Sequence, residues 1–143
     1  MSLLAAASLC ITIGSIKFCN DSVPQYITDN TIYLSEVTEA NATAVYCDRI
    51  WGVEEVRHYY RKKNYVKVDC ETDTEVIEAG LDKRSSLDSV QQAVFFSALT
   101  DKKPVVVIYD TDGKEGRFEY RIRKVCEALG IEYRSIRVAK KEL

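Results

Sequence analysis

The segment that most constrains this chain is residues 105–117, VVVIYDTDGKEGR, in which an unbroken apolar run ends abruptly in two acids. Pro104 opens the run and a glycine-containing loop closes it. A continuous apolar run of this length predicts a parallel strand that is covered on both faces. Such a strand requires a sheet with helices around it, so the segment predicts an α/β fold.

The second half of the chain supplies the partners that such a strand needs. Short strands are expected at 65–69 and 131–138, the latter near a sheet edge, because apolar and polar residues alternate there. Helices are expected at 72–80, from Ser86 or Ser89 to about Thr100, and from about Lys114 to Gly130. This order indicates a layered α/β fold with a mostly parallel central sheet flanked by helices, of the Rossmann-like kind.

The first half has weaker patterns. A hairpin is expected across 9–18 around Gly14, short strands at 31–34 and 43–47, and a helix at 53–63. With 143 residues, one domain is expected over 1–143. Within it, residues 65–138 form the recognisable core and residues 1–64 form an N-terminal extension packed on that core.

Composition excludes several classes of protein. No apolar run reaches the length of a membrane span, so no membrane partner is expected. The opening segment lacks the basic residues and cleavage site of a signal peptide. The five cysteines are odd in number and never form a CxxC pair, which predicts buried free thiols and a cytoplasmic location. A homo-oligomer is compatible with the sequence, but no feature indicates one.

Charge is segregated although the net charge is only −2. Residues 57–66 contain four bases, Arg57, Arg61, Lys62 and Lys63, and no acid. Tyrosines interleave with these bases, a composition that can track a nucleic-acid backbone and stack its bases. The same pattern also fits an amphipathic helix with a solvated basic side. Both interpretations stay open at this stage.

Asp110 and Asp112 lie where a parallel sheet binds ligands, beyond the carboxyl end of a strand. Their oxygens suit Mg²⁺, which takes one or two protein carboxylates and completes its shell with water and phosphate. Lys114 and Arg117, near a helix N-terminus, can bind the phosphate. The alternative is a simple turn in which Asp112 caps the following helix.

The segment VVVIYDTDGKEGR resembles the second acidic motif of Toprim domains, an apolar strand that ends in D-x-D and is followed by glycine and arginine. It is similar to the YDxDxxGR pattern of bacterial primases, matched by Tyr109, Asp110, Asp112, Gly116 and Arg117. Residues 66–81 resemble the upstream acidic motif, in which Asp69 or Glu71 takes the place of the family's glutamate. The resemblance covers about residues 65–138.

The resemblance implies Mg²⁺-dependent phosphoryl transfer or hydrolysis on nucleic acid. Asp110 and Asp112 would hold the metal, and Asp69 or Glu71 would act as general acid/base or as a further ligand. The basic residues would bind phosphate or nucleic acid. The alternative function is a non-catalytic α/β binding or assembly protein in which DTDG is only a structural turn.

Overall fold

The computed structural model describes residues 10–13, 16–19 and 30–142. The chain divides into two compact units, Met1–Asn30 and Thr31–Leu143. In the first unit, β1 (Cys10–Ile13) and β2 (Ile16–Cys19) pair antiparallel, with Cys10 opposite Cys19. The expected hairpin is confirmed, while its turn at Gly14 lies outside the described residues.

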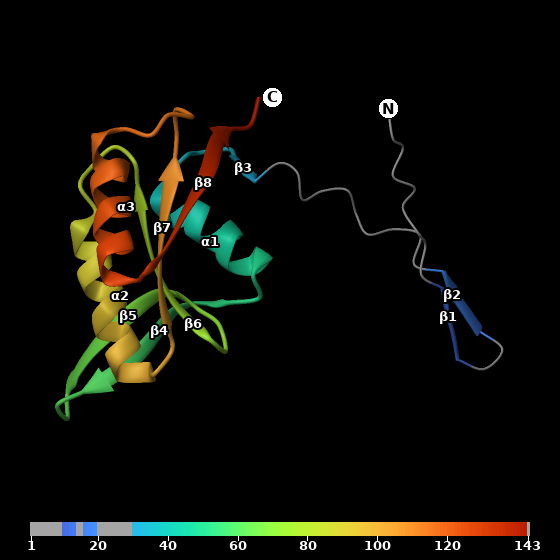
Figure 1. Cartoon of the computed structure of the whole chain (residues 1–143), viewed down its shortest axis with the longest axis horizontal. Coiled ribbons are helices and arrows are strands. Elements are labelled where there is room, and N and C mark those ends of the chain that lie inside the picture. Colours follow the sequence, from blue (N-terminus) through green and yellow to red (C-terminus); the bar gives the residue numbers. More distant parts are fainter. Residues whose placement is uncertain (1–9, 14–15, 20–29, 143) are drawn as a thin grey trace. The chain divides into compact units, whose positions relative to one another are not determined.

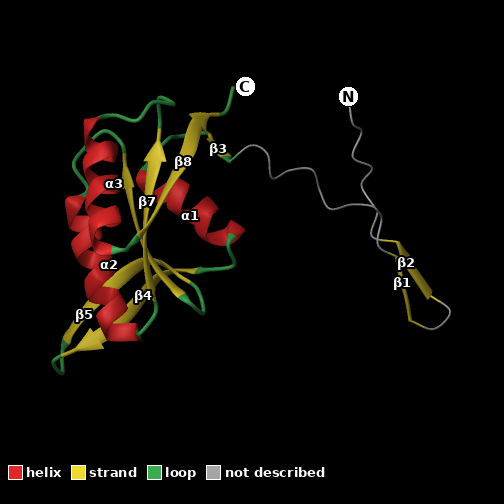
Figure 2. Cartoon of the chain, viewed as in Figure 1, coloured by secondary structure: helices red, strands yellow, loops and turns green. Residues whose placement is uncertain are grey.

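The second unit is a six-stranded mixed sheet in the order β3-β8-β7-β6-β5-β4, flanked by helices (Figures 1 and 2). Its strands are β3 (Thr31–Leu34), β4 (Val53–Tyr60), β5 (Asn64–Glu71), β6 (Glu75–Leu81), β7 (Lys103–Asp110) and β8 (Glu132–Lys140). Its helices are α1 (Glu39–Arg49), α2 (Leu87–Thr100) and α3 (Arg117–Leu129). Four neighbouring strands, β3, β8, β7 and β6, pair in parallel. Strand β5 pairs antiparallel with β6 on one side and with β4 on the other. The predicted α/β class with a mostly parallel sheet is confirmed.

Strand β7 is buried on both faces, as its apolar run predicts. Val105, Val107 and Tyr109 pack with residues of α1 in one core cluster. Val106 and Ile108 point the other way and pack with residues of α2 and α3. Figure 1 shows the same arrangement, with α2 and α3 on one side of β7 and α1 on the other. Because successive side chains of a strand alternate in direction, one continuous run supplies both cores.

Three expected elements of the sequence analysis are wrong. Residues 43–47 belong to helix α1, which begins after the N-cap Thr38, whose side chain accepts a hydrogen bond from the Asn41 amide at 3.1 Å. Residues 53–63, expected as a helix, form β4 and the turn after it. Residues 72–80, also expected as a helix, contain most of β6. A short apolar pattern fits both the helical period of about 3.6 residues and the strand period of about 2, and packing against the neighbouring elements decides between them.

The last strand, β8, was expected near an edge but lies between β7 and β3. The edge position belongs to β3, whose residues 31–34 were correctly expected to form a strand. Helices α2 and α3 occur where they were expected, and Gly130 ends α3 in the left-handed conformation with φ 68°. No helix within residues 30–142 combines the length and apolar character needed to cross a membrane.

The cysteine prediction needs a correction. Cys47 of α1 and Cys70 of β5 form a disulfide, whereas free thiols were expected. Only Cys126 is a free, buried thiol among the cysteines whose side chains the structure describes. The sequence could not indicate the pair, because 23 residues separate the two cysteines and only the packing of α1 on the sheet brings them together.

Candidate metal centre at the carboxyl edge of the sheet

Three carboxylates meet where β6 and β7 end side by side. The two strands are parallel, with Leu81 opposite Tyr109, so the residues that follow each strand emerge at the same edge. Asp82 follows β6, Asp110 ends β7, and Asp112 lies in the loop to α3. One carboxylate oxygen from each lies within 4.8 Å of the others. This arrangement is the ligand position expected of a parallel sheet.

Asp82 links the two loops at this edge. Its Oδ2 accepts a hydrogen bond from the Thr111 amide at 2.6 Å, and the Thr111 hydroxyl lies 3.0 Å from Oδ1 and 2.9 Å from Oδ2. The Asp82 amide donates to the Tyr109 carbonyl at 3.1 Å, which extends the pairing of the strands by one step. The position of Asp82 is thereby fixed relative to the loop that carries the other two acids.

Asp110 organises the loop that follows β7. Its Oδ1 accepts from the amides of Asp112 at 3.0 Å and Gly113 at 2.6 Å. Gly113 adopts φ +79°, a conformation that favours glycine, so this position explains the residue type. The hydrogen bonds to the Asp110 carboxylate all reach Oδ1, and its Oδ2 has no partner among the described residues. An ionised carboxylate has about four acceptor positions, so Asp110 retains capacity for a cation.

Asp112 is not the cap of the next helix. The N-cap of α3 is Gly116, and Asp112 Oδ1 instead accepts from the Lys114 amide at 2.9 Å. The Gly116 amide donates to Glu119 Oε2 at 2.6 Å, which closes the first turn of α3. Asp112 is exposed, and its Oδ2 has no partner among the residues that the structure describes.

Two charged residues near the acids were not identified from the sequence. Arg137 of β8 donates from Nη1 to the Asp110 carbonyl at 3.2 Å, and its contact with Asp110 Oδ1 is 3.4 Å. Glu119 is 2% exposed, and this burial raises the pKa of its carboxyl group. The hydrogen bond from the Gly116 amide lowers the pKa, and the negative charges of the three acids at this edge raise it further. The sequence signal for Arg137 was the basic character of the C-terminal segment, residues 117–143, which has eight bases and four acids.

Asp69 and Glu71 do not join these carboxylates. Glu71 pairs with Val76 at the amino end of β6, which is the opposite end of that strand from Asp82. Its Oε1 accepts from Lys102 Nζ at 2.6 Å, and its Oε2 contacts His58 Nε2. Burial alone would raise the pKa of Glu71, but the bonds from Lys102 and His58 lower it. The geometry assigns Glu71 to an ion-pair network that ties β4, β5 and the α2–β7 connection together.

Asp69, which is half-buried, instead pairs with the buried Glu78 of β6. Asp69 Oδ2 accepts from the Ala79 amide at 2.9 Å, and Glu78 Oε1 accepts from the Asp69 amide at 3.2 Å. The backbone pairing of β5 with β6 covers only Glu71 and Cys70. At the next position, Asp69, the two carboxyl side chains supply the hydrogen bonds to the opposite backbone instead. Burial raises the pKa of Asp69, and burial together with the charge of Asp69 raises the pKa of Glu78 to about 9.

The predicted basic residues occupy two separate places. Lys114 and Arg117 lie at the acidic edge, in the loop before α3 and at its first position, and both are exposed. Arg57 lies on β4, and Arg61, Lys62 and Lys63 form the turn between β4 and β5. Only the first pair is positioned to bind a phosphate near the acids.

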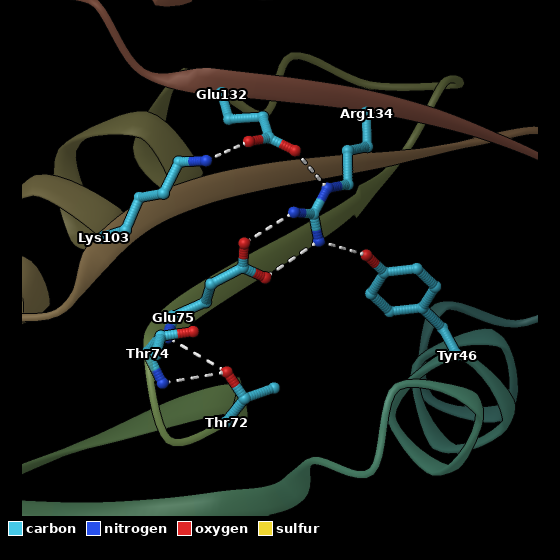
Figure 3. A network of polar contacts seen from close by, with 7 residues as sticks. All are labelled: Tyr46, Thr72, Thr74, Glu75, Lys103, Glu132 and Arg134. Atoms are coloured by element: carbon cyan, nitrogen blue, oxygen red, sulfur yellow. Dashed lines mark hydrogen bonds and ion pairs between the residues drawn. The ribbon is translucent and has the colours of Figure 1, made fainter.

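A third polar group, at the amino ends of the parallel strands, is structural in geometry (Figure 3). Arg134 of β8 donates to both oxygens of Glu75, at 3.0 and 2.7 Å, and to the Tyr46 hydroxyl at 2.8 Å. Its Nε donates to Glu132 at 2.6 Å, and Glu132 also pairs with Lys103. Burial by itself would lower the pKa of Arg134, but the hydrogen bonds to Glu75, Tyr46 and Glu132 outweigh this effect and raise the pKa. These contacts connect β6, β7, β8 and α1.

No protein-family model, curated protein or solved structure matches this chain.

Proposed function

We propose that the carboxyl edge of the sheet binds Mg²⁺ and that the chain is a Mg²⁺-dependent module acting on the phosphates of nucleic acid. The observation that carries this proposal is the convergence of Asp82, Asp110 and Asp112 from the ends of two adjacent parallel strands. Three carboxylates form a hard-oxygen donor set of the kind that Mg²⁺ prefers. Asp82 would supply the upstream acid that the resemblance to Toprim domains implied at Asp69 or Glu71.

The surroundings of the three acids support a phosphate ligand. Asp110 Oδ2 and Asp112 Oδ2 have no hydrogen-bond partner among the described residues and point to capacity for a cation. Lys114 and Arg117 offer exposed cations at the same edge. Arg137 contacts Asp110 and can neutralise it before the metal binds or bind the phosphate afterwards. When bound, the metal would stabilise the charge that develops on the transferred phosphoryl group.

A second candidate is the non-catalytic binding or assembly module. It is favoured by the hydrogen bonds that Asp82, Asp110 and Asp112 already make with the loop backbone, since these close the turn without any cation. Under this candidate the acids serve as turn residues.

A titration with Mg²⁺ and Mn²⁺, followed by amide NMR shifts, separates the two candidates. For the wild-type protein we expect saturable shifts clustered at residues 82–83 and 109–117, with strong Mn²⁺ broadening of the same amides. Asp110→Asn/Asp112→Asn abolishes them. The matched control is Asp73→Asn/Asp101→Asn, which removes two exposed acids at the other ends of the strands and leaves the shifts unchanged.

Cleavage of an end-labelled oligonucleotide in Mg²⁺ tests the chemical step. We expect cleavage by the wild type and the control, and its loss in Asp82→Asn and Asp110→Asn/Asp112→Asn. Absence of localised shifts at millimolar metal would overturn the metal site, and the second candidate, in which the acids are turn residues, would remain. Shifts without cleavage would support the metal site and contradict the proposed hydrolytic activity.

A further inference from the structure

Strands β4 and β5 form an antiparallel ribbon that separates from the rest of the sheet. Their register runs from Val53 opposite Glu71 to Tyr60 opposite Asn64, whereas β5 pairs with β6 only at Cys70 and Glu71. In Figure 1 the ribbon extends at the lower left beside α2. Tyr60 packs against Phe95 of α2, with ring centroids 5.4 Å apart, which fixes one face of the ribbon on the helix.

The other face of the ribbon presents aromatic rings to solvent. Tyr59 and Tyr65 are directly opposed in the ladder, with centroids 5.7 Å apart and exposed fractions of 65% and 47%. The Arg57 guanidinium lies over the Tyr65 ring at 5.0 Å, and Lys67 is opposite Arg57 in the register. Two rings held together by cross-strand pairing, rather than by a core, form a platform on which a nucleic-acid base can stack.

The tip of the ribbon is basic despite a conformational cost. Arg61 and Lys62 adopt the left-handed conformation, with φ 44° and 66°. Glycine or asparagine usually occupies such hairpin positions, because a side chain with a Cβ atom is disfavoured there by about 1–2 kcal/mol. Arg61, Lys62 and Lys63 are all exposed, so no internal contact explains the choice of cations. Strain of this kind concentrates at functional positions.

A groove lies between the ribbon and α2. It has a volume of about 400 Å³ and is lined by Val66, Lys67, Gln91, Gln92, Phe95 and Phe96. Its rings and side-chain amides suit a nucleobase, which needs a stacking partner and hydrogen-bond donors and acceptors. The Lys67 ammonium donates to Glu55 Oε1 at 2.9 Å.

We propose that the β4–β5 ribbon is a binding surface for single-stranded nucleic acid. Residues 57–67 contain five bases and no acid. Lys67 pairs with Glu55 of β4, and the other four, Arg57, Arg61, Lys62 and Lys63, make the surface complementary to a polyanion. Exposed rings distinguish a single strand from a duplex, whose bases are already stacked. The surface is separate from the three acids, and the inference therefore does not depend on the proposed function.

The test is fluorescence anisotropy with an end-labelled oligothymidylate, in EDTA so that the metal site makes no contribution. We expect saturable binding by the wild type at low salt. Arg61→Gln/Lys62→Gln should weaken it at least tenfold and reduce the slope of log K against log salt by about 1.4, because each phosphate contact contributes about 0.7 for single strands. Tyr59→Ala should weaken binding about tenfold with little change in that slope.

A charge-matched variant supplies the control. Lys140→Gln/Lys141→Gln removes two exposed cations near the end of β8 and should leave the affinity within about twofold of wild type. Unfolding curves of all variants test whether each is folded. Absence of saturable binding, equal weakening in the control, or equal affinity for a duplex of the same length would overturn the proposal. Because EDTA is present, a failed metal site cannot produce any of these results.

Discussion

At the scale of single residues, the most unusual group is Glu78, a carboxyl that is only 2% exposed and has a carboxyl neighbour. Its pKa is raised to about 9, against an ordinary value of 4.5, chiefly by burial and next by the charge of Asp69. Glu78 is therefore protonated at neutral pH. An acid kept neutral in this way can lie in a sheet interior without a cationic partner.

The proton on Glu78 predicts how stability depends on pH. The folded state holds this proton between pH 4.5 and about 9, while the unfolded chain releases it near 4.5. The stabilising contribution is therefore complete below pH 4.5 and is lost as pH rises toward about 9. Glu78→Gln retains the shape of the neutral acid. We expect the wild type, relative to this variant, to lose at least about 1 kcal/mol of unfolding free energy across that range.

Urea unfolding of both proteins at several pH values measures this difference. Glu54→Gln, which removes an exposed acid from β4, is the control and should follow the wild type. Parallel curves for wild type and Glu78→Gln would show that Glu78 is ionised in the folded protein.

At the scale of elements, the Cys47–Cys70 disulfide fastens α1 to β5. Gly52 lies against it, and a Cβ there would be 2.5 Å from Cys70 Sγ and 2.8 Å from Cys47 Sγ. These distances are too short for a side chain unless the sulfurs move. The absence of a side chain at Gly52 lets the chain turn from α1 into β4 over the disulfide.

Removing the disulfide should lower the stability of the whole sheet unit. For a separation of 23 residues, the entropy of the closed loop predicts a loss of about 3 kcal/mol. Thermal unfolding with and without reductant, beside Cys47→Ala/Cys70→Ala, measures it. The reductant should destabilise the wild type and leave the double variant unchanged. If the reductant has the same effect on both, the disulfide does not form.

The ribbon turn predicts opposite changes in stability and binding. Lys62→Gly removes the cost of a side chain at φ 66°, so we expect it to stabilise the protein by up to about 1 kcal/mol. The same change removes a cation from the proposed binding surface and should weaken oligothymidylate binding. Thermal unfolding and anisotropy test the two effects separately. A loss of stability would mean that the Lys62 side chain makes a stabilising contact.

At the scale of the unit Thr31–Leu143, the acidic edge and the ribbon lie toward opposite ends of α2. Asp82 precedes the first turn of the helix, whereas Phe95, which packs on the ribbon, lies in its second half. A helix of 14 residues is about 21 Å long. Figure 1 shows the carboxyl end of β7 at the top and the ribbon at the bottom.

Two sites so far apart should act independently. Arg61→Gln/Lys62→Gln should leave the Mg²⁺ affinity unchanged, and Asp110→Asn/Asp112→Asn should leave oligothymidylate binding in EDTA unchanged. In the combined variant, the losses of binding free energy for Mg²⁺ and for oligothymidylate should each equal the loss in the corresponding separate variant within about 0.5 kcal/mol. A larger coupling in the presence of Mg²⁺ would indicate one strand contacting both sites.

The sequence by itself determined the elements whose patterns are long or locally complete. The apolar run of β7 specified a strand covered on both faces, because only a central position buries side chains that point in both directions. The helix before it and the helix after it followed from apolar spacing, from a serine N-cap expected at Ser86 or Ser89, and from Gly130. Ser86 holds the N-cap position, but its side chain makes no capping hydrogen bond. These elements were enough to specify the α/β class and to direct attention to Asp110 and Asp112.

Only the tertiary structure decided the identity of β4, β6 and α1 and the composition of the acidic edge. Segments of seven to eleven residues fit more than one period, and hydrogen bonding to a neighbouring strand or burial against the sheet selects the conformation. Once β6 pairs in parallel with β7, Asp82 lies near Asp110, while the Asp69 amide bonds to Glu78 on the neighbouring strand. Convergence of residues distant in sequence depends on strand pairing across the whole sheet, which no local pattern encodes.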